Sequence, residues 1–240
     1  MAEIEYVQEL LSYVPTMLAK RLVTDPAPLE APVAERFQAV VMLVDITGFT
    51  ALTERWAMPG LDGAEAISEL LNNYFSQLIE IIHVYGGDVV KFAGDALLAV
   101  WKDATPLDLT LLASSCALNI QQKLQNYSPA EGVFLTMRIG LGQGELVAAH
   151  VGGMRGRWEF VVTGVPVTQA SLAEIRAAPG QVVVSNNTLE RIMGSFLTEP
   201  LGEFALKGLQ QKMPVFAILG SAAAPAGPSS APHTLSATRV

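Results

Sequence analysis

The sequence predicts an α+β fold, because apolar runs typical of strands alternate with segments of helical periodicity. The run Val40–Val44 consists of β-branched and long apolar residues, which is typical of a strand buried on both faces. From residue 64 to residue 81, apolar residues recur three and four positions apart, which predicts a helix ending at Gly86-Gly87. Residues 88–101 hold two β-rich runs around Ala93-Gly94-Asp95, which predicts a hairpin with an acid at its tip.

Length and composition limit the class of protein. The 240 residues are enough for one large domain, or for one domain with appendages. The 23 acidic and 15 basic residues give a net charge of −8, which argues against a general nucleic-acid-binding protein. The amino terminus carries Glu3 and Glu5 where a secretory signal would be basic, and no 18-residue apolar run is present. We therefore expect a cytoplasmic protein without membrane insertion.

We expect three parts along the chain. Residues 1–37 predict a helical arm and a proline-rich connector, with helical spacing from Tyr6 to Leu18 and an interruption near Pro15. This arm either packs on the outside of the main domain or serves as a regulatory or partner-binding segment. Residues 38–220 are expected to form the main domain. Residues 221–240 have the Ala/Pro/Ser-rich composition of a disordered linker or tail.

Periodicity and turn residues predict the remaining elements. Residues 108–126 are expected to form a second helix, with an inward face of Leu109, Leu112, Ala113, Cys116, Ile120 and Leu124. The single cysteine, Cys116, excludes a disulfide within the chain and is expected in the core. The segment Gly142-Gln143-Gly144 predicts a turn between strands 134–141 and 145–150, and the Gly/Arg-rich segment 151–158 predicts a mobile loop. Further strands are expected at 160–163, 181–185, 204–206 and 215–219, and further helices at 50–59, 167–178 and 187–193.

The strongest candidate site follows the first buried strand. Asp45 lies at the end of this strand, before a small turn that closes on Gly48 and Thr50. Such an acid can hold a divalent cation while the turn amides point at a phosphate. Asp95 is either a simple turn former or, opposite Asp45, the second carboxylate of a metal site. Arg138, in an otherwise apolar strand, is either solvent-exposed or salt-bridged, or it binds a polyphosphate.

Several motifs together resemble the class III nucleotidyl cyclases. They are Val44-Asp-Ile-Thr-Gly-Phe-Thr50, Gly86-Gly-Asp-Val-Val-Lys-Phe-Ala-Gly-Asp95, Met137-Arg-Ile-Gly-Leu141 and Leu206-Lys-Gly208. The sequence is most similar to the first catalytic half of the soluble, bicarbonate-responsive adenylyl cyclases, over about residues 1–219.

The resemblance implies a ferredoxin-like βαββαβ core with additional strands, which acts as a head-to-tail dimer with the site at the interface. It implies a reaction in which ATP gives 3′,5′-cyclic AMP and pyrophosphate with the help of two Mg²⁺ ions, for which Mn²⁺ can substitute. The implied metal ligands are Asp45, Asp95 and the Ile46 carbonyl, and the implied triphosphate-binding residues are Gly48, Phe49, Thr50 and Arg138.

The resemblance also shows where this chain departs from a complete catalytic half. Val161, Thr168 and Leu172 hold the positions of the residue that reads the base, of an asparagine and of the arginine that stabilises the transition state. Lys91 matches a base-contacting lysine, which in first halves of the soluble enzyme binds bicarbonate with an arginine; Ser171 holds that arginine's position.

These departures predict a homodimer that is weak or inactive and a requirement for a complementary half. The alternatives are a catalytically silent nucleotide-binding module for regulation or dimerisation, and a guanylyl cyclase half.

Overall fold

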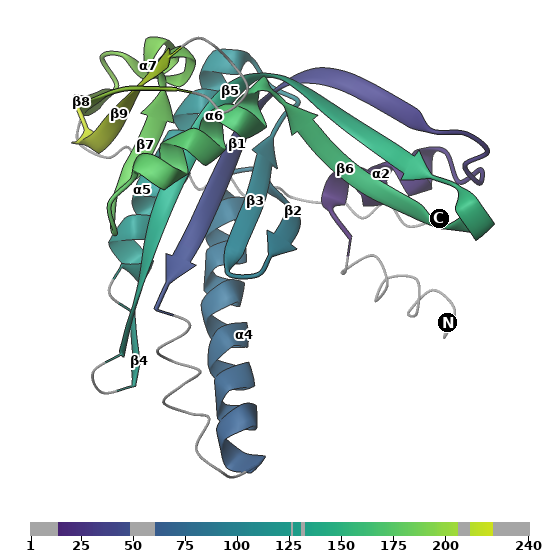
Figure 1. The fold of residues 1–240 in the computed structure, drawn as a ribbon, viewed down its shortest axis with the longest axis horizontal. Coiled ribbons are helices and arrows are strands. Elements are labelled where there is room, and N and C mark those ends of the chain that lie inside the picture. Colours follow the sequence, from purple (N-terminus) through teal and green to yellow (C-terminus); the bar gives the residue numbers. More distant parts are fainter. Residues whose placement is uncertain (1–13, 49–60, 126, 131–132, 206–211, 223–240) are drawn as a thin grey trace, which may run out of the picture.

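The strands of the protein form one mixed sheet with helices on both faces (Figure 1). The computed structural model describes residues 14–48, 61–125, 127–130, 133–205 and 212–222. Within these residues nine strands form the sheet, in the order β2-β3-β1-β5-β7-β9-β8, with β4 and β6 also paired to β5. The helices are α2 (Thr16–Thr24), α4 (Leu61–Val84), α5 (Pro106–Leu124), the 3-10 turn η1 (Met154–Gly156), α6 (Val165–Arg176) and α7 (Asn186–Ile192). The strands are β1 (Val33–Thr47), β2 (Asp88–Ala93), β3 (Ala96–Trp101), β4 (Tyr127–Ala130), β5 (Val133–Gly152), β6 (Trp158–Gly164), β7 (Val182–Ser185), β8 (Phe196–Ala205) and β9 (Lys212–Ser221).

The expected ferredoxin-like core is confirmed. Its elements follow the chain as β1-α4-β2-β3-α5-β5, and the four strands lie in the spatial order β5-β1-β3-β2 with antiparallel neighbours. Strands β7, β9 and β8 extend the sheet beyond β5, and β7 is parallel to β5. The α+β class predicted from the alternation of strands and helices therefore holds, and the additional strands are the ones the resemblance implied.

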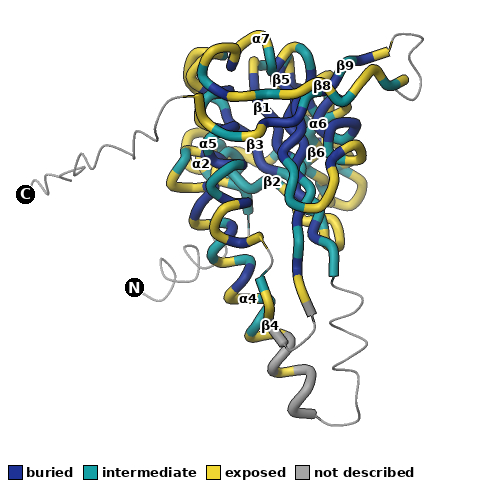
Figure 2. The backbone as a smooth tube through the Cα atoms, turned by 90° about the vertical axis from the view of Figure 1, so that its left-hand side faces the viewer, coloured by how far each residue is buried: buried dark blue, intermediate teal, exposed yellow. Residues whose placement is uncertain are grey.

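The main core lies between the sheet and the helices α4 and α5 (Figure 2). Trp101 is fully buried, donates its indole N–H to the Tyr85 carbonyl at 2.8 Å and packs beside Gly87. Cys116 is fully buried as expected, and burial raises the pKa of its thiol. The predicted inward face of α5 is correct except at Leu112, which is 40% exposed. The buried face of α5 is broader than predicted and is turned away from Leu112, because Thr110, Ser114, Ala117 and Gln121 are buried as well.

The predicted turn at residues 142–144 is wrong, because β5 is one continuous strand of 20 residues. Gly140 and Gly142 serve helix packing instead. A Cβ atom at Gly140 would overlap the Ala170 carbonyl, and one at Gly142 would overlap the Pro166 carbonyl, both on α6. The two glycines therefore allow α6 to lie directly on β5. From the sequence alone, glycines that allow close helix packing cannot be distinguished from glycines that form a turn.

The segment 151–158 is also more regular than expected. Strands β5 and β6 pair as far as Gly152 and Trp158, so only η1 and its flanking residues connect them. Strand β8 starts at Phe196, well before the expected 204–206, because it pairs along its whole length with β9. Strand β4 was not predicted. The expected helix at 50–59 and the tail from residue 223 onward lie outside the described residues.

The amino-terminal arm contributes one described helix, α2, whose first residue follows Pro15. Both carboxylate oxygens of Asp88 accept from the first turn of α2, from the Thr16 and Met17 N–H groups at 2.8 Å each. No residue of α2 is fully buried. Residues 33–37 belong to β1 and so to the sheet, which corrects the expected end of the arm at residue 37. No helix of the described part is long and apolar enough to cross a membrane, and the expected cytoplasmic location stays a prediction.

The contact between β5 and α6 predicts that Gly140→Ala destabilises the protein. The added methyl group meets the backbone of α6, so we expect the free energy of unfolding to fall by roughly 1–3 kcal/mol or more. Gly220→Ala is the matched control, since a Cβ atom there has no neighbour within 4 Å. Its effect should stay within about 0.5 kcal/mol in urea denaturation. Equal unfolding midpoints for the two variants would contradict this account of Gly140.

Candidate active site

The register of three neighbouring strands brings the predicted site residues together. Asp45 on β1 lies opposite Arg138 on β5 and opposite Ala96 on β3. The Ile46 N–H donates to the Asp95 carbonyl at 3.2 Å, which fixes the tip of the β2–β3 hairpin beside the end of β1. The hairpin itself is confirmed, with Gly94 at a φ of +67° in the turn.

Arg138 forms an ion pair with Asp45. Its Nε donates to Asp45 Oδ2 at 3.1 Å, and its Nη2 contacts the same oxygen. The side chains of Arg138 and Asp45 are 29% and 19% exposed, so the pair is largely shielded from water. The hydrogen bond to Asp45 is the main reason that the pKa of Arg138 is raised, and it keeps the guanidinium charged. Of the alternatives for Arg138, the structure shows the salt-bridged one, and the partner is the predicted metal ligand itself.

Glu174 on α6 is a member of the site that sequence reasoning missed. Its Oε1 lies 3.1 Å from Arg138 Nη2, and its side chain is only 13% exposed. Burial raises the pKa of the Glu174 carboxyl; Arg138 lowers it, and Asp45 and Asp95 raise it again, with a net increase. The position of Glu174 depends on the close approach of α6 to Gly140. The sequence shows only a glutamate within a predicted helix, which does not indicate that it belongs to the site.

The donor set at the end of β1 suits a hard divalent cation. Asp45, Asp95 and the Ile46 carbonyl offer oxygen ligands, which Mg²⁺ prefers, and Mg²⁺ takes its remaining ligands from water and substrate phosphates. Among the described residues no group of three or more His, Cys, Asp or Glu side chains is arranged to hold a metal alone. A site with two carboxylate ligands suits a metal ion that takes its remaining ligands from a nucleotide bound with it.

The turn after β1 is described only as far as Gly48. This residue has a φ of +106°, and a Cβ atom on it would lie 2.5 Å from the Phe134 carbonyl, so glycine is required there. Thr47 supports the same place through a hydrogen bond of 2.6 Å between its hydroxyl and that of Thr136. Phe49 and Thr50, the other predicted triphosphate-binding residues, lie outside the described residues.

The positions at which the resemblance implied departures from a complete half lie on β6 and α6. Val161 is 36% exposed on β6. On α6, Thr168 donates its hydroxyl to the Gly164 carbonyl at 3.4 Å, and Ser171 is half-buried. Leu172 is 8% exposed and packs in an apolar cluster with Val183, Met213 and Val215 among others. Leu172 therefore has a packing role, and its aliphatic side chain cannot stabilise charge.

Lys91 lies apart from the pair of Asp45 and Arg138. Its side chain is 59% exposed on β2, and its Nζ is 3.9 Å from Glu159 Oε1 on β6. The hairpin β2–β3 and strand β6 are thus linked by an exposed ion pair, which is typically worth at most about 1 kcal/mol.

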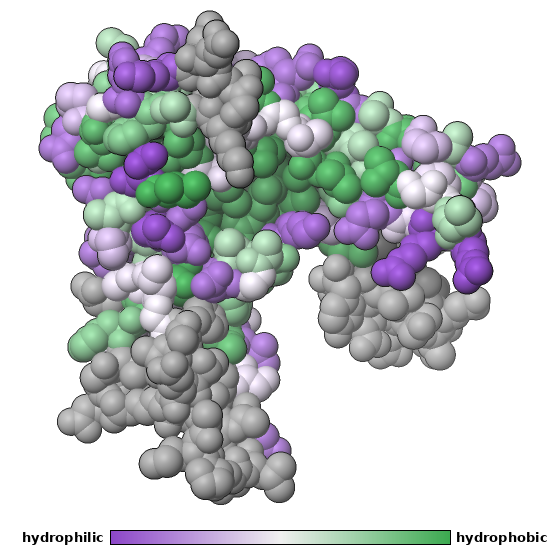
Figure 3. All heavy atoms as spheres, in the orientation of Figure 1, coloured by the Kyte–Doolittle hydropathy of each residue, from purple (hydrophilic) through white to green (hydrophobic). Residues whose placement is uncertain are grey.

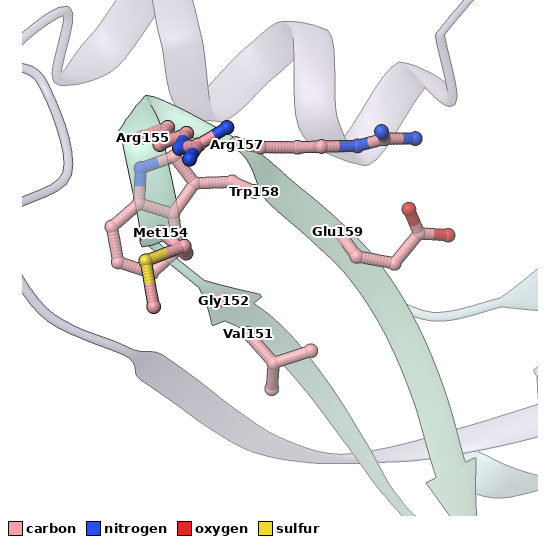
Figure 4. Close-up of a pocket in the computed structure, with 7 residues that line it drawn as sticks. All are labelled: Val151, Gly152, Met154, Arg155, Arg157, Trp158 and Glu159. Atoms are coloured by element: carbon pink, nitrogen blue, oxygen red, sulfur yellow. The ribbon is translucent and has the colours of Figure 1, made fainter.

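A separate open groove of about 680 Å³ lies at the other end of β5, around η1 (Figure 4). It is lined by Trp158, Arg155, Arg157 and Met154, of which Met154 is 81% exposed. None of the predicted site residues lines this groove.

Comparison with known proteins identifies the class of this fold and site. Residues 33–220 match the family model described as the adenylate and guanylate cyclase catalytic domain. The chain belongs to this family. It is 38% identical over 162 residues to adenylate cyclase type 10 of Oryctolagus cuniculus, an alignment that covers 66% of this chain and 10% of the relative. The chain thus spans about one tenth of the length of that relative.

Solved structures give the same class. The catalytic core of a rhodopsin-guanylyl cyclase with converted specificity, in complex with ATPαS, is 27% identical with a TM-score of 0.66 and covers 78% of this chain and 98% of that one. The non-canonical dimeric guanylyl cyclase domain of the RhoGC fusion protein from the aquatic fungus Blastocladiella emersonii is 25% identical with a TM-score of 0.64, and the match covers 78% of this chain and 99% of that one.

The ion pairs of Arg138 predict a pH-dependent loss of stability in Arg138→Met. The variant leaves the Asp45 and Glu174 carboxylates without their cation, so we expect a loss of roughly 1–3 kcal/mol at neutral pH in urea denaturation. When the pKa of a carboxyl group is raised in the folded state, the free energy of unfolding falls as the pH rises from the ordinary pKa, which is 4.5 for Glu174, through the raised value. Removing Arg138 raises the pKa of Glu174 further, so the loss should shrink as the pH falls through this window.

Two control variants separate this effect from a general loss of charge. Arg36→Met breaks only the exposed pair with Glu145, whose side chains are 67% and 53% exposed, and should have little effect at any pH. Adding Glu174→Gln to Arg138→Met should remove much of the pH dependence. A loss in Arg138→Met that is independent of pH would show that Glu174 does not contribute.

Proposed function

We propose that this chain is the metal- and triphosphate-binding half of an adenylyl cyclase, which needs a complementary half for full activity. The observation that carries the proposal is the convergence of Asp45 on β1, Asp95 at the tip of the β2–β3 hairpin and Arg138 on β5. Membership of the cyclase family and the similarity to adenylate cyclase type 10 support the adenylyl assignment.

The proposed reaction is the cyclisation of ATP. The 3′-hydroxyl loses its proton and attacks the α-phosphorus in line, the bond to the β-phosphate oxygen breaks, and 3′,5′-cyclic AMP and pyrophosphate are formed. Two bound Mg²⁺ ions, or Mn²⁺ in their place, would activate the hydroxyl and neutralise the phosphate charge, held by Asp45, Asp95 and the Ile46 carbonyl.

Arg138 and Glu174 suit an exchange of partners when the nucleotide binds. The guanidinium that pairs with Asp45 can pair instead with phosphate oxygens, for which its planar fork is well shaped. Asp45 then has both oxygens available for a cation. Glu174, 3.1 Å from Nη2, keeps the guanidinium at the site during this exchange.

A second cyclase domain is the proposed protein partner. The sheet face opposite α4 and α5 carries Leu43, Val90, Leu98 and Val162, which are only partly buried. Figure 3 shows apolar residues gathered in the hollow of this view of the molecule. A partner domain that covers this face would bury them. The cyclase domain from Blastocladiella emersonii, whose dimer is described as non-canonical, supports pairing of two cyclase domains but not this particular face.

A homodimer would contain two metal-binding half-sites, and each would lack the stabilising arginine, because Leu172 holds its position in both copies. Losing one such group typically lowers the rate by roughly 10²–10³-fold. Weak or absent activity of the chain alone follows. Ser171 in place of the arginine, and the ion pair of Lys91 with Glu159, argue against bicarbonate regulation without deciding it.

The test is a cyclase assay with Mg²⁺ or Mn²⁺ and with ATP or GTP, on the chain alone and mixed with a partner domain. The partner carries the asparagine, the arginine and the base-reading residues, but its own metal-binding aspartates are replaced by asparagine. Cyclic AMP should form only in the mixture, and Asp45→Asn in this chain should lower the rate by on the order of 10²-fold or more.

Asp103→Asn is the matched control. Asp103 is an exposed surface acid with a φ of +68°, a conformation that asparagine tolerates, so the rate should not change. Substantial activity of the chain alone would overturn the half-site proposal. Cyclic GMP as the main product would indicate a guanylyl cyclase half, and Mg-ATP binding without any cyclic product would indicate a silent regulatory module.

A further inference from the structure

A small cavity lies between α2 and the sheet, far from the candidate active site. It has a volume of about 100 Å³ and is lined by residues that include Arg21, Glu35, Phe37, Lys102, His150 and Phe160. Val33 on β1 lies opposite His150 on β5, and Asp45 lies twelve positions further along β1. At about 3.3 Å per residue, these twelve positions correspond to about 40 Å of strand between Val33 and Asp45.

His150 is the buried polar group of this cavity. The residue is 9% exposed, and its ring packs on Phe160 with 5.2 Å between centroids. Its Nε2 is buried and has no hydrogen-bond partner among the described residues. Because an unsatisfied buried polar atom costs on the order of 1–3 kcal/mol, such an atom beside a cavity indicates a place for a polar ligand.

The charges around the cavity favour an anion. Two cations, Arg21 and Lys102, face one carboxylate, that of Glu35. In the part of the chain that the structure describes, Arg21 forms no ion pair, while Lys102 lies 4.7 Å from the Phe37 ring and 3.6 Å from Asp103. Burial first and then Arg21 lower the pKa of His150, so its imidazole is neutral and can donate one N–H.

The walls restrict the ligand to a small molecule with an apolar part. Phe37 and Phe160 provide aromatic surface, and Met17 and Ala148 provide aliphatic surface. One water needs on the order of 10–15 Å³ of such space, so about 100 Å³ holds a ligand of several non-hydrogen atoms.

We propose that this cavity binds a small aliphatic carboxylate between α2 and the sheet. Arg21 pairs with the carboxylate, His150 Nε2 donates a hydrogen bond to one of its oxygens, and the aliphatic part lies between Phe37 and Phe160. The bound molecule connects α2 to β5. Otherwise α2 is held mainly by the contact of its first turn with Asp88, since none of its residues is fully buried.

The experiment follows the imidazole nitrogens of the full chain by NMR while butyrate, acetate or chloride is added. The chain has three histidines, so the His150 signal can be assigned by elimination with His83→Gln and His233→Gln. We expect saturable shifts of His150 Nε2, with butyrate binding tighter than acetate by about fourfold for each buried methylene. Arg21→Gln should weaken butyrate binding by at least about tenfold, because it removes the charged partner.

Lys20→Gln is the matched control, because Lys20 is an exposed cation on the same helix that does not line the cavity. Its affinity for butyrate should equal that of the unchanged chain. The proposal is overturned if His150 shows no saturable shift, if chloride acts as strongly as butyrate, or if Lys20→Gln and Arg21→Gln weaken binding equally. None of these measurements involves turnover, so their outcome is independent of the proposed cyclase function.

Discussion

The contact of Arg138 with Asp45 and Glu174 is the interaction on which the site depends. It joins the ends of β1 and β5 with helix α6, and it places three charged groups where fewer than a third of each side chain is exposed. Charges shielded to this degree are stable only when they are paired. Gly140 and Gly142 make the arrangement possible, because any side chain at these positions would keep α6 and Glu174 away from β5.

The same contact gives the site its chemical character. Asp45 and Asp95 alone would repel each other, and Arg138 offsets their negative charge. A bound metal ion can take over this role when a polyphosphate becomes the partner of Arg138. The hairpin tip is fixed to β1 through the backbone, by the hydrogen bond from the Ile46 N–H to the Asp95 carbonyl. The side chains that would bind metal and nucleotide can therefore change partners while the strands that carry them stay in place.

Features that depend on local sequence were predictable, and features that depend on packing were not. The strand before Asp45 and the hairpin before Asp95 follow from residue type and turn chemistry, and together they bring the two acids to one end of the sheet. The continuity of β5 was missed because glycine in a strand and glycine in a turn look alike until the helix above them is known. Glu174 was missed for the same reason, and the exposure of Leu112 shows that periodicity does not give the width of a buried stripe.

The proposed function requires that Asp45 binds a metal together with a nucleotide after Arg138 releases it. Electron paramagnetic resonance of Mn²⁺ tests this requirement, with 3′-deoxy-ATP, which cannot cyclise, added to the chain and to Asp45→Asn. We expect Mn²⁺ and the nucleotide each to bind more tightly in the presence of the other, and this coupling to be lost in Asp45→Asn. Equal coupling in both proteins, or nucleotide binding that does not depend on the metal, would contradict it.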